Sequence, residues 1–80
     1  LHGVPYHVKD LVNTAGVRTT FGSLLHEDNV PKTDAVSAAR MKAAGGILVG
    51  KTTTPEFGHK ALSDGPLFGK CHNAWDQRRT

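Results

Sequence analysis

A lysine near the start of the chain stands at the end of a short strand pattern. In the stretch HGVPYHVKD, apolar residues alternate with other types, which predicts a strand over Val4–Val8 with one apolar face. Lys9 follows directly, and Asp10 follows Lys9. A lysine that is shielded from water can give up its proton and act as a base, whereas an exposed lysine is an ordinary surface charge. The pattern alone leaves both interpretations of Lys9 open.

A second segment, GGILVGKT at Gly45–Thr52, matches the letters of a phosphate-binding loop, G-x-x-x-x-G-K-[ST]. Such a loop lies between a strand and a helix, because the amide groups at the start of that helix bind the phosphate. Here a helix is predicted before the motif, and Gly46–Val49 has the composition of a strand. A phosphate- or nucleotide-binding module at Gly45–Thr52 therefore stays as an alternative to a buried strand flanked by glycines.

The other nucleophilic and metal-binding side chains show no functional spacing. None of the serines lies in a G-x-S-x-G turn, which exposes the nucleophile of many hydrolases. The histidines form no i, i+4 pair and have no acidic partner at metal-ligand spacing. They are His2, His7, His26, His59 and His72. The sequence predicts no metal site, and it gives no support to a serine–histidine hydrolase centre.

Composition narrows the functional class. The 80 residues carry ten Lys or Arg and seven Asp or Glu, and the cations are scattered rather than interleaved with aromatic residues. We therefore predict no nucleic-acid partner. No run of 18 apolar residues occurs, so no membrane span is expected. Cys71 is the only cysteine, which favours a reducing compartment, and we predict a cytoplasmic protein. Because strand-like and irregular patterns run to both ends, we expect residues 1–80 to be a single incomplete domain.

The middle of the chain contains the clearest predicted helix. Thr33 is placed as its N-cap, Asp34 suits the positive end of its dipole, and Gly45 is placed to end it in the left-handed conformation. A narrow apolar stripe is expected along it, from Ala35, Val36, Ala39 and Ala43.

Strands are expected on both sides of this helix. A second short strand is predicted over Val17–Phe21, which is rich in β-branched residues. The run at Gly46–Val49 should be buried on both faces, as in the centre of a sheet. One turn of helix is predicted from Pro55. A helix followed by a buried strand indicates an α/β fold.

Read as a whole, the sequence resembles the amidase signature family. The family pattern G-[IV]-P-x-x-V-K-D is matched within LHGVPYHVKDLVNTAGVRTTFGS, and two further blocks follow in family order, DAVSAARMKAAGGILVGKTTTPEFG and SDGPLFGKCHNAWDQRRT. Ala74 departs from the proline of the family's N-P-W-D motif. The resemblance implies that the chain is an α/β fragment of the amidase signature core, a mixed β-sheet covered by helices.

The resemblance also implies a chemistry. Family members hydrolyse a carboxylic amide of a small molecule to an acid and ammonia or an amine, through an acyl-enzyme made by a Ser–cis-Ser–Lys unit. The lysine of the V-K-D motif is Lys9, which would act as the base in the complete enzyme and would there be shielded from water. Asp10 would support Lys9 without touching the substrate, and Gly58 and His59 would line the acyl pocket. No metal or organic cofactor is implied.

In the family, a glycine- and serine-rich stretch supplies the nucleophile and the bridging serine, and it follows the point that corresponds to Thr80. We therefore expect the isolated 80 residues to be inactive, and a non-catalytic scaffold fragment remains an alternative interpretation. The sequence leaves the oligomeric state open, including a homodimer.

Overall fold

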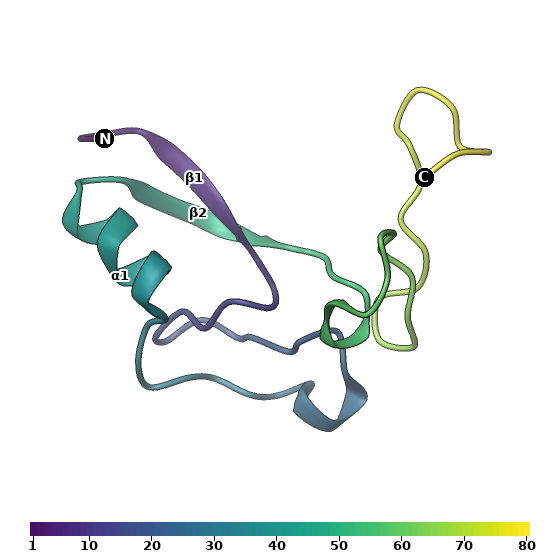
Figure 1. Cartoon of the computed structure of the whole chain (residues 1–80), viewed down its shortest axis with the longest axis horizontal. Helices are drawn as coiled ribbons and strands as arrows, with labels where there is room; N and C mark the ends of the chain where they lie inside the picture. Colours follow the sequence, from purple (N-terminus) through teal and green to yellow (C-terminus); the bar gives the residue numbers. More distant parts are fainter.

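The computed structural model describes all of the residues Leu1–Thr80. Its regular elements are, in chain order, β1 (Pro5–Lys9), the 3₁₀ turn η1 (Leu24–His26), α1 (Val36–Ala43), β2 (Ile47–Thr52) and the 3₁₀ turn η2 (Glu56–Gly58). Figure 1 shows β1 and β2 side by side, with the C-terminal segment projecting away from the rest of the molecule. None of the helices has the length and apolar character needed to cross a bilayer.

The two strands form a parallel sheet that contains one irregularity. Tyr6 lies opposite Leu48 but His7 lies opposite Gly50, so one extra residue of β2, Val49, is accommodated at this point. A bulge of this kind changes the face on which the following side chains lie.

The consequence of the bulge is clearest at Lys51. Tyr6 and Val8 are the half-buried residues of β1, and their partners in the register are Leu48 and Lys51, which are also half-buried. Without the extra residue, Leu48 and Lys51 would point to opposite faces, because they are three positions apart. The bulge therefore brings the Lys51 side chain to the sheltered face of the sheet.

The strand predicted at Gly46–Val49 is present but shifted, and its predicted burial on both faces is wrong. The strand β2 runs from Ile47 to Thr52, and Val49 is 67% exposed. The reason is that the sheet has only two strands, so it offers no central position. The strand predicted over Val4–Val8 is confirmed to within one residue, as β1 at Pro5–Lys9.

No strand forms over Val17–Phe21, so that prediction is also wrong. Phe21 has a φ of 57°, which is incompatible with an extended strand. Thr19 and Thr20 are fully buried, and their amides donate to the Asn29 carbonyl and the Asp10 carboxylate rather than to a neighbouring strand. The β-branched threonines that suggested a strand are instead buried in a loop, where no strand pairs with them.

The predicted helix is present as α1, and its C-terminus forms as expected. Gly45 has a φ of 90°, its amide donates to the Lys42 carbonyl, and the Gly46 amide donates to the Met41 carbonyl. These two bonds are those of a Schellman motif, in which the left-handed residue is glycine.

The predicted start and apolar stripe of α1 need correction. The N-cap residue is Ala35, which makes no side-chain cap, and Thr33 lies outside the helix. Ala38 is the buried residue of α1, whereas Val36 of the expected stripe is exposed. Asp34 instead joins the helix start to the preceding loop, because its carboxylate accepts a hydrogen bond from the Ala15 amide at 2.7 Å and pairs with Lys42 at 3.0 Å.

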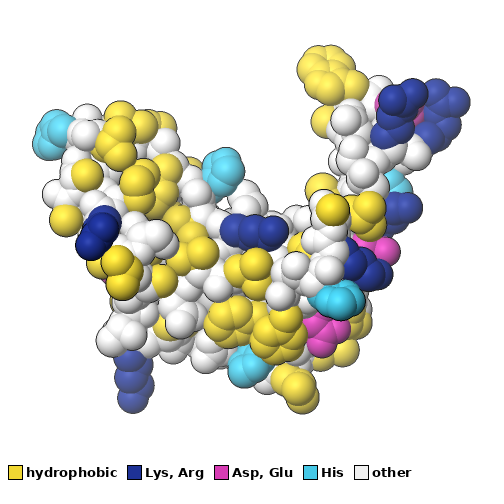
Figure 2. All heavy atoms as spheres, viewed as in Figure 1, with side chains coloured by type: hydrophobic (Ala, Val, Ile, Leu, Met, Phe, Trp, Pro, Cys, Tyr) yellow, Lys and Arg dark blue, Asp and Glu magenta, His cyan; other side chains and the backbone are white.

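The interior of the molecule is polar. Ala38 is the only buried hydrophobic residue. The buried side chains with polar or charged groups come largely from the loops that follow β1 and β2: Asp10, Thr14, Thr19, Thr20, Ser23 and Thr54. Figure 2 shows that many hydrophobic side chains lie on the surface instead. Hydrogen bonds among the loops, rather than apolar packing, therefore define the arrangement of this chain.

Candidate functional site

Lys9 is the last residue of β1, where the chain leaves the sheet. Its side chain belongs to the exposed half of the strand's alternation, together with Pro5 and His7. Its carbonyl accepts a hydrogen bond from the Val12 amide at 3.0 Å, so the chain turns immediately after it. The side chain of Lys9 is exposed in these 80 residues, and the shielding expected for the complete enzyme stays a prediction.

Asp10, the next residue, fastens this end of β1 to two other segments. Its amide donates to the Thr52 carbonyl at 2.9 Å, and its carbonyl accepts from the Phe21 amide at 2.9 Å. Its carboxylate accepts hydrogen bonds from the amide and from the hydroxyl of Thr20. The residue is 4% exposed, so these bonds replace the water that a charged group would otherwise require. The position of Lys9 is therefore set by a neighbour with little freedom to move.

Lys51 carries the half-buried ammonium group of the chain. Its Nζ donates to the Val12 carbonyl at 2.5 Å, to the Thr14 hydroxyl at 3.0 Å and to the Thr19 hydroxyl at 3.0 Å. Burial lowers the pKa of Lys51 below its ordinary value, and the negative charge of Asp10 opposes this shift. An ammonium has three N–H donors and no acceptor, so three oxygen acceptors satisfy it completely. Lys51 is thus bonded as a cation and has no free donor for a substrate.

Two cavities lie beside these segments. The larger has a volume of about 380 Å³ and is lined by Pro55, Glu56, Phe57, His59, Lys60, Asp64, Gly65 and Pro66. The smaller has a volume of about 290 Å³ and is lined by Asp10, Val17, Arg18, Lys51, Thr52, Thr53 and Phe68. Residues of the sequence-predicted site are thus divided between two places: His59 at the first cavity and Asp10 at the second.

Gly58 lies next to the larger cavity without lining it. It has a φ of 69°, and a Cβ at this position would lie 2.7 Å from Leu11 Cδ1. Leu11 belongs to the turn that follows Lys9, so the wall that carries His59 packs against the end of β1 on its other side.

Two phenylalanines with unusual backbone conformations connect the loop after β1 to the wall of the larger cavity. Phe21 and Phe57 have φ values of 57° and 49°, and the Phe57 amide donates to the Phe21 carbonyl at 2.7 Å. Their rings are stacked with centroids 5.8 Å apart, and the His26 ring lies edge-on to both. A left-handed backbone is costly for residues with side chains, and such strain is found at functional sites. Here the Phe57 ring of this pair lies in the wall of the larger cavity.

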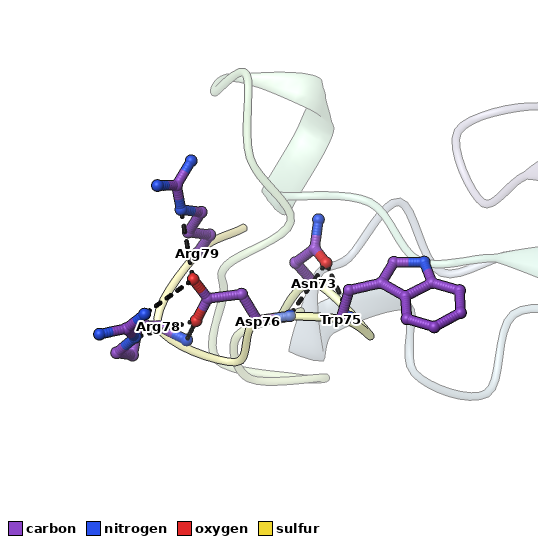
Figure 3. Close-up of polar contacts among 5 residues, drawn as sticks. All are labelled: Asn73, Trp75, Asp76, Arg78 and Arg79. Carbon is purple, nitrogen blue, oxygen red and sulfur yellow. Dashed lines mark hydrogen bonds and ion pairs between the residues drawn. The ribbon is translucent and has the colours of Figure 1, made fainter.

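The C-terminal segment ends in a turn that forms despite Ala74 in place of proline. The Asn73 side-chain oxygen accepts hydrogen bonds from the Trp75 and Asp76 amides, and the Asn73 amide donates to the Arg79 carbonyl. Figure 3 shows the Asp76 carboxylate between the Arg78 and Arg79 side chains, with the Trp75 ring pointing away from them.

Hydrogen bonds from the Arg78 side chain and amide lower the pKa of Asp76, which keeps the carboxylate charged for these two cations. The hydrogen bonds made by Asn73 are thus enough to form the turn without proline.

The structure decides one of the alternatives left by the sequence. Lys51 and Thr52 of the motif Gly45–Thr52 lie within β2, which is extended and paired with β1. A phosphate loop needs curved backbone whose amides converge, so the interpretation of this motif as a phosphate-binding module is wrong. No group of three His, Cys, Asp or Glu residues is placed to hold a metal ion.

Sequence reasoning missed the polar cluster around Lys51. In the sequence, Lys51 stands out only as the lysine of a phosphate-loop motif, and no motif or spacing marks Thr14 or Thr19. Both threonines are buried and both accept from Lys51 Nζ. The one available signal was the density of threonines on both sides of Lys51, because threonine hydroxyls are suitable partners for a buried ammonium.

Comparisons with known proteins agree along the chain. The family model named Amidase matches residues 1–80. An acylamidase of Rhodococcus erythropolis is 45% identical over 75 residues, which is 94% of this chain. A glutamyl-tRNA(Gln) amidotransferase subunit from Anaeromyxobacter dehalogenans is 44% identical over all 80 residues. The solved structure of 6-aminohexanoate cyclic dimer hydrolase complexed with substrate covers 95% of this chain, with a TM-score of 0.85 and 34% identity.

This chain spans 16% of the length of each of these three proteins. The strand–helix–strand unit of β1, α1 and β2, with its polar loops, therefore corresponds to one part of a larger α/β core. A family model matches every residue, and the solved hydrolase structure is similar to this chain in both fold and sequence. The resemblance seen in the sequence therefore reflects homology. The chain belongs to the amidase family.

Proposed function

We propose that this chain is part of an enzyme that hydrolyses a carboxylic amide to an acid and ammonia or an amine. Among its relatives, one is named as an acylamidase and another as a hydrolase of a 6-aminohexanoate cyclic dimer. The reaction proceeds through an acyl-enzyme formed on a serine, with a second serine that relays the proton and Lys9 as the base. Both serines belong to the glycine- and serine-rich stretch that the resemblance implies beyond Thr80.

The main support for Lys9 as the base is a difference between the two lysines at this end of the sheet, Lys9 and Lys51. Lys51 has its three N–H donors occupied by oxygen acceptors, so it has no free position for proton transfer. Lys9 lies one residue beyond Val8, the register partner of Lys51, and its side chain is on the open face. Of the two, Lys9 is the lysine that further chain can approach and enclose.

Asp10 supports this role through its fixed position rather than through contact with substrate. Its carboxylate is held by Thr20, and its backbone bonds fix the chain on both sides. We propose that this arrangement limits the movement of Lys9 relative to the two serines, since small displacements of a reacting group cost roughly 100-fold in rate.

The acyl part of the substrate is proposed to occupy the larger cavity. Its walls combine the Phe57 ring with the polar groups of Glu56, His59 and Lys60. The volume of about 380 Å³ falls within the range of small-molecule sites, which are typically hundreds of Å³. Replacement of His59 by Ala should raise the KM for amides with short acyl chains while leaving the kcat nearly unchanged.

A fluorophosphonate probe, which labels activated serines, tests the acyl-enzyme reaction. The full-length protein should be labelled, and preincubation with a slowly hydrolysed amide should protect it. The isolated 80 residues should not be labelled, because the reaction assigns the nucleophile to a serine outside them. Labelling of the 80 residues alone, or hydrolysis of amides by a full-length protein that resists the probe, would contradict the proposed mechanism. Absence of both labelling and hydrolysis in the full-length protein would favour the scaffold interpretation.

A further inference from the structure

We propose that Lys51 is a positioning residue for the amidase reaction, because its ammonium fixes the loop that connects Lys9 to the rest of the site. This inference rests on the proposed function of Lys9. Lys51 itself touches neither substrate nor the reacting atoms in this proposal, and it acts through the Lys9–Thr20 loop.

The contacts of Lys51 all reach into that one loop. Nζ binds the Val12 carbonyl, the Thr14 hydroxyl and the Thr19 hydroxyl, which are 39, 37 and 32 positions away in the sequence. Val12 is also the residue whose amide donates to the Lys9 carbonyl. A single ammonium therefore connects β2 to the first turn after Lys9 and to the far end of the loop.

The hydrogen bonds of Lys51 matter for stability because the two threonines that accept them are buried. Thr14 and Thr19 are 2% and 0% exposed, so water cannot readily replace Lys51 if its ammonium is removed. The Thr14 and Thr19 hydroxyls lie 3.5 Å apart and could then bond to one another, but the Val12 carbonyl would lose its side-chain donor. Buried polar groups that lose a partner drive local rearrangement, because the unsatisfied state is costly.

The bulge in the sheet provides independent support. Lys51 reaches the loop only because the extra residue at Val49 places it on the same face as Val8. Bulges that redirect a side chain are frequent beside active sites. Asp10, Arg18 and Lys51 line the smaller cavity together, and the charge of Lys51 interacts with that of Asp10, the residue that follows Lys9.

The test measures amide hydrolysis by the full-length protein with Lys51→Met, which keeps the length of the side chain and removes its donors. We expect kcat per fluorophosphonate-titrated serine to fall roughly 100-fold, as for a displaced catalytic group, with KM changed less than about threefold. The matched control is Lys42→Met on α1, where the lysine side chain is 61% exposed and pairs only with Asp34. It should retain wild-type kcat and KM.

A second pair of variants applies if Lys51→Met does not fold. Thr14→Val replaces one hydroxyl by a methyl group of similar size and should lower kcat about tenfold, whereas Thr14→Ser restores the hydroxyl and should recover most of the rate. Valine keeps the size of threonine and removes the hydroxyl, whereas serine keeps the hydroxyl and removes a methyl group. Recovery of the rate by serine would therefore assign the effect to the hydrogen bond rather than to packing.

Two results distinguish failure of this inference from failure of the proposed function. If Lys9→Met abolishes hydrolysis while Lys51→Met and Thr14→Val keep wild-type kcat per titrated serine, Lys51 does not position Lys9 and only the inference is overturned. If Lys9→Met itself is fully active, the proposed function of Lys9 fails, and the inference fails with it.

Discussion

Gly22, in the segment TTFGS, provides a sharp test of how the loops after β1 and β2 pack. Its φ is +70°, and a Cβ built on it would lie 2.8 Å from the Thr54 carbonyl oxygen and 3.0 Å from the carbonyl carbon and oxygen of Pro55. All three are backbone atoms, so no side-chain rotation can relieve the contact. Gly16 is the matched control, since its φ is +75° and a Cβ there meets nothing within 4 Å.

The two sites separate two costs of adding a methyl group. A left-handed backbone costs a residue with a Cβ about 1–2 kcal/mol, and both Gly16→Ala and Gly22→Ala should show this cost. Overpacking adds about 1–3 kcal/mol at Gly22 alone. We therefore expect Gly22→Ala to lower the free energy of unfolding by about 2–5 kcal/mol, against about 1–2 kcal/mol for Gly16→Ala.

Urea denaturation of the full-length protein measures this difference. The midpoint should fall further for Gly22→Ala than for Gly16→Ala, with equal slopes, which would show that only stability has changed. The close approach of Gly22 to Thr54 and Pro55 also holds the wall of the larger cavity, so Gly22→Ala should raise KM as well. Equal midpoints for the two variants would refute the packing described here.

Two further predictions concern carboxylates. In Asp10→Asn, one of the two carboxylate oxygens that accept from the Thr20 amide and the Thr20 hydroxyl becomes an NH2 group, which cannot accept. The substitution should therefore destabilise the full-length protein by roughly 1.5–3 kcal/mol, and a wild-type urea midpoint would contradict this. The hydrogen bond from the Ala15 amide and the interaction with Lys42 lower the pKa of Asp34 below its ordinary value. The unfolded state therefore binds the proton more readily, so the stabilisation by Asp34 is present above the ordinary pKa and is lost as the pH falls through the pKa of the folded state. Midpoints measured from pH 5 to pH 2 should therefore depend less on pH for Asp34→Asn, and an unchanged dependence would contradict this.

Local patterns in the sequence predicted the elements that local physics controls. The alternation of apolar residues predicted β1, and Gly45 predicted the end of α1, because few residues other than glycine adopt the left-handed conformation. One turn of helix was predicted from Pro55. The 3₁₀ turn η2 is found there, with Phe57 in the left-handed rather than the helical region.

Features that depend on the number of neighbours were not predictable. The run ILV at Ile47–Val49 has the composition of a central strand, but in this chain it has one neighbouring strand, so Val49 is exposed. The segment Val17–Phe21 has β-branched residues but finds a carboxylate and an ammonium as partners instead of a strand.

In the candidate site too, some features follow from local sequence and others depend on neighbouring segments. Asp10 was expected to support Lys9, and its bonds to Thr20 and Thr52 are consistent with that expectation without testing catalysis. Lys51 could not be assigned, because its face depends on a bulge at Val49 that no sequence pattern indicates.

The most direct test of the proposed base is the hydrolysis rate of the full-length protein with Lys9→Met, compared with Lys42→Met. We predict that Lys9→Met lowers kcat by more than about 1,000-fold, as when one member of a serine-based triad is removed, and that added small primary amines restore part of the rate. Lys42→Met should be unaffected. Hydrolysis by Lys9→Met at the wild-type rate would show that the proton is taken by another group, and the role assigned to Lys9 would be wrong.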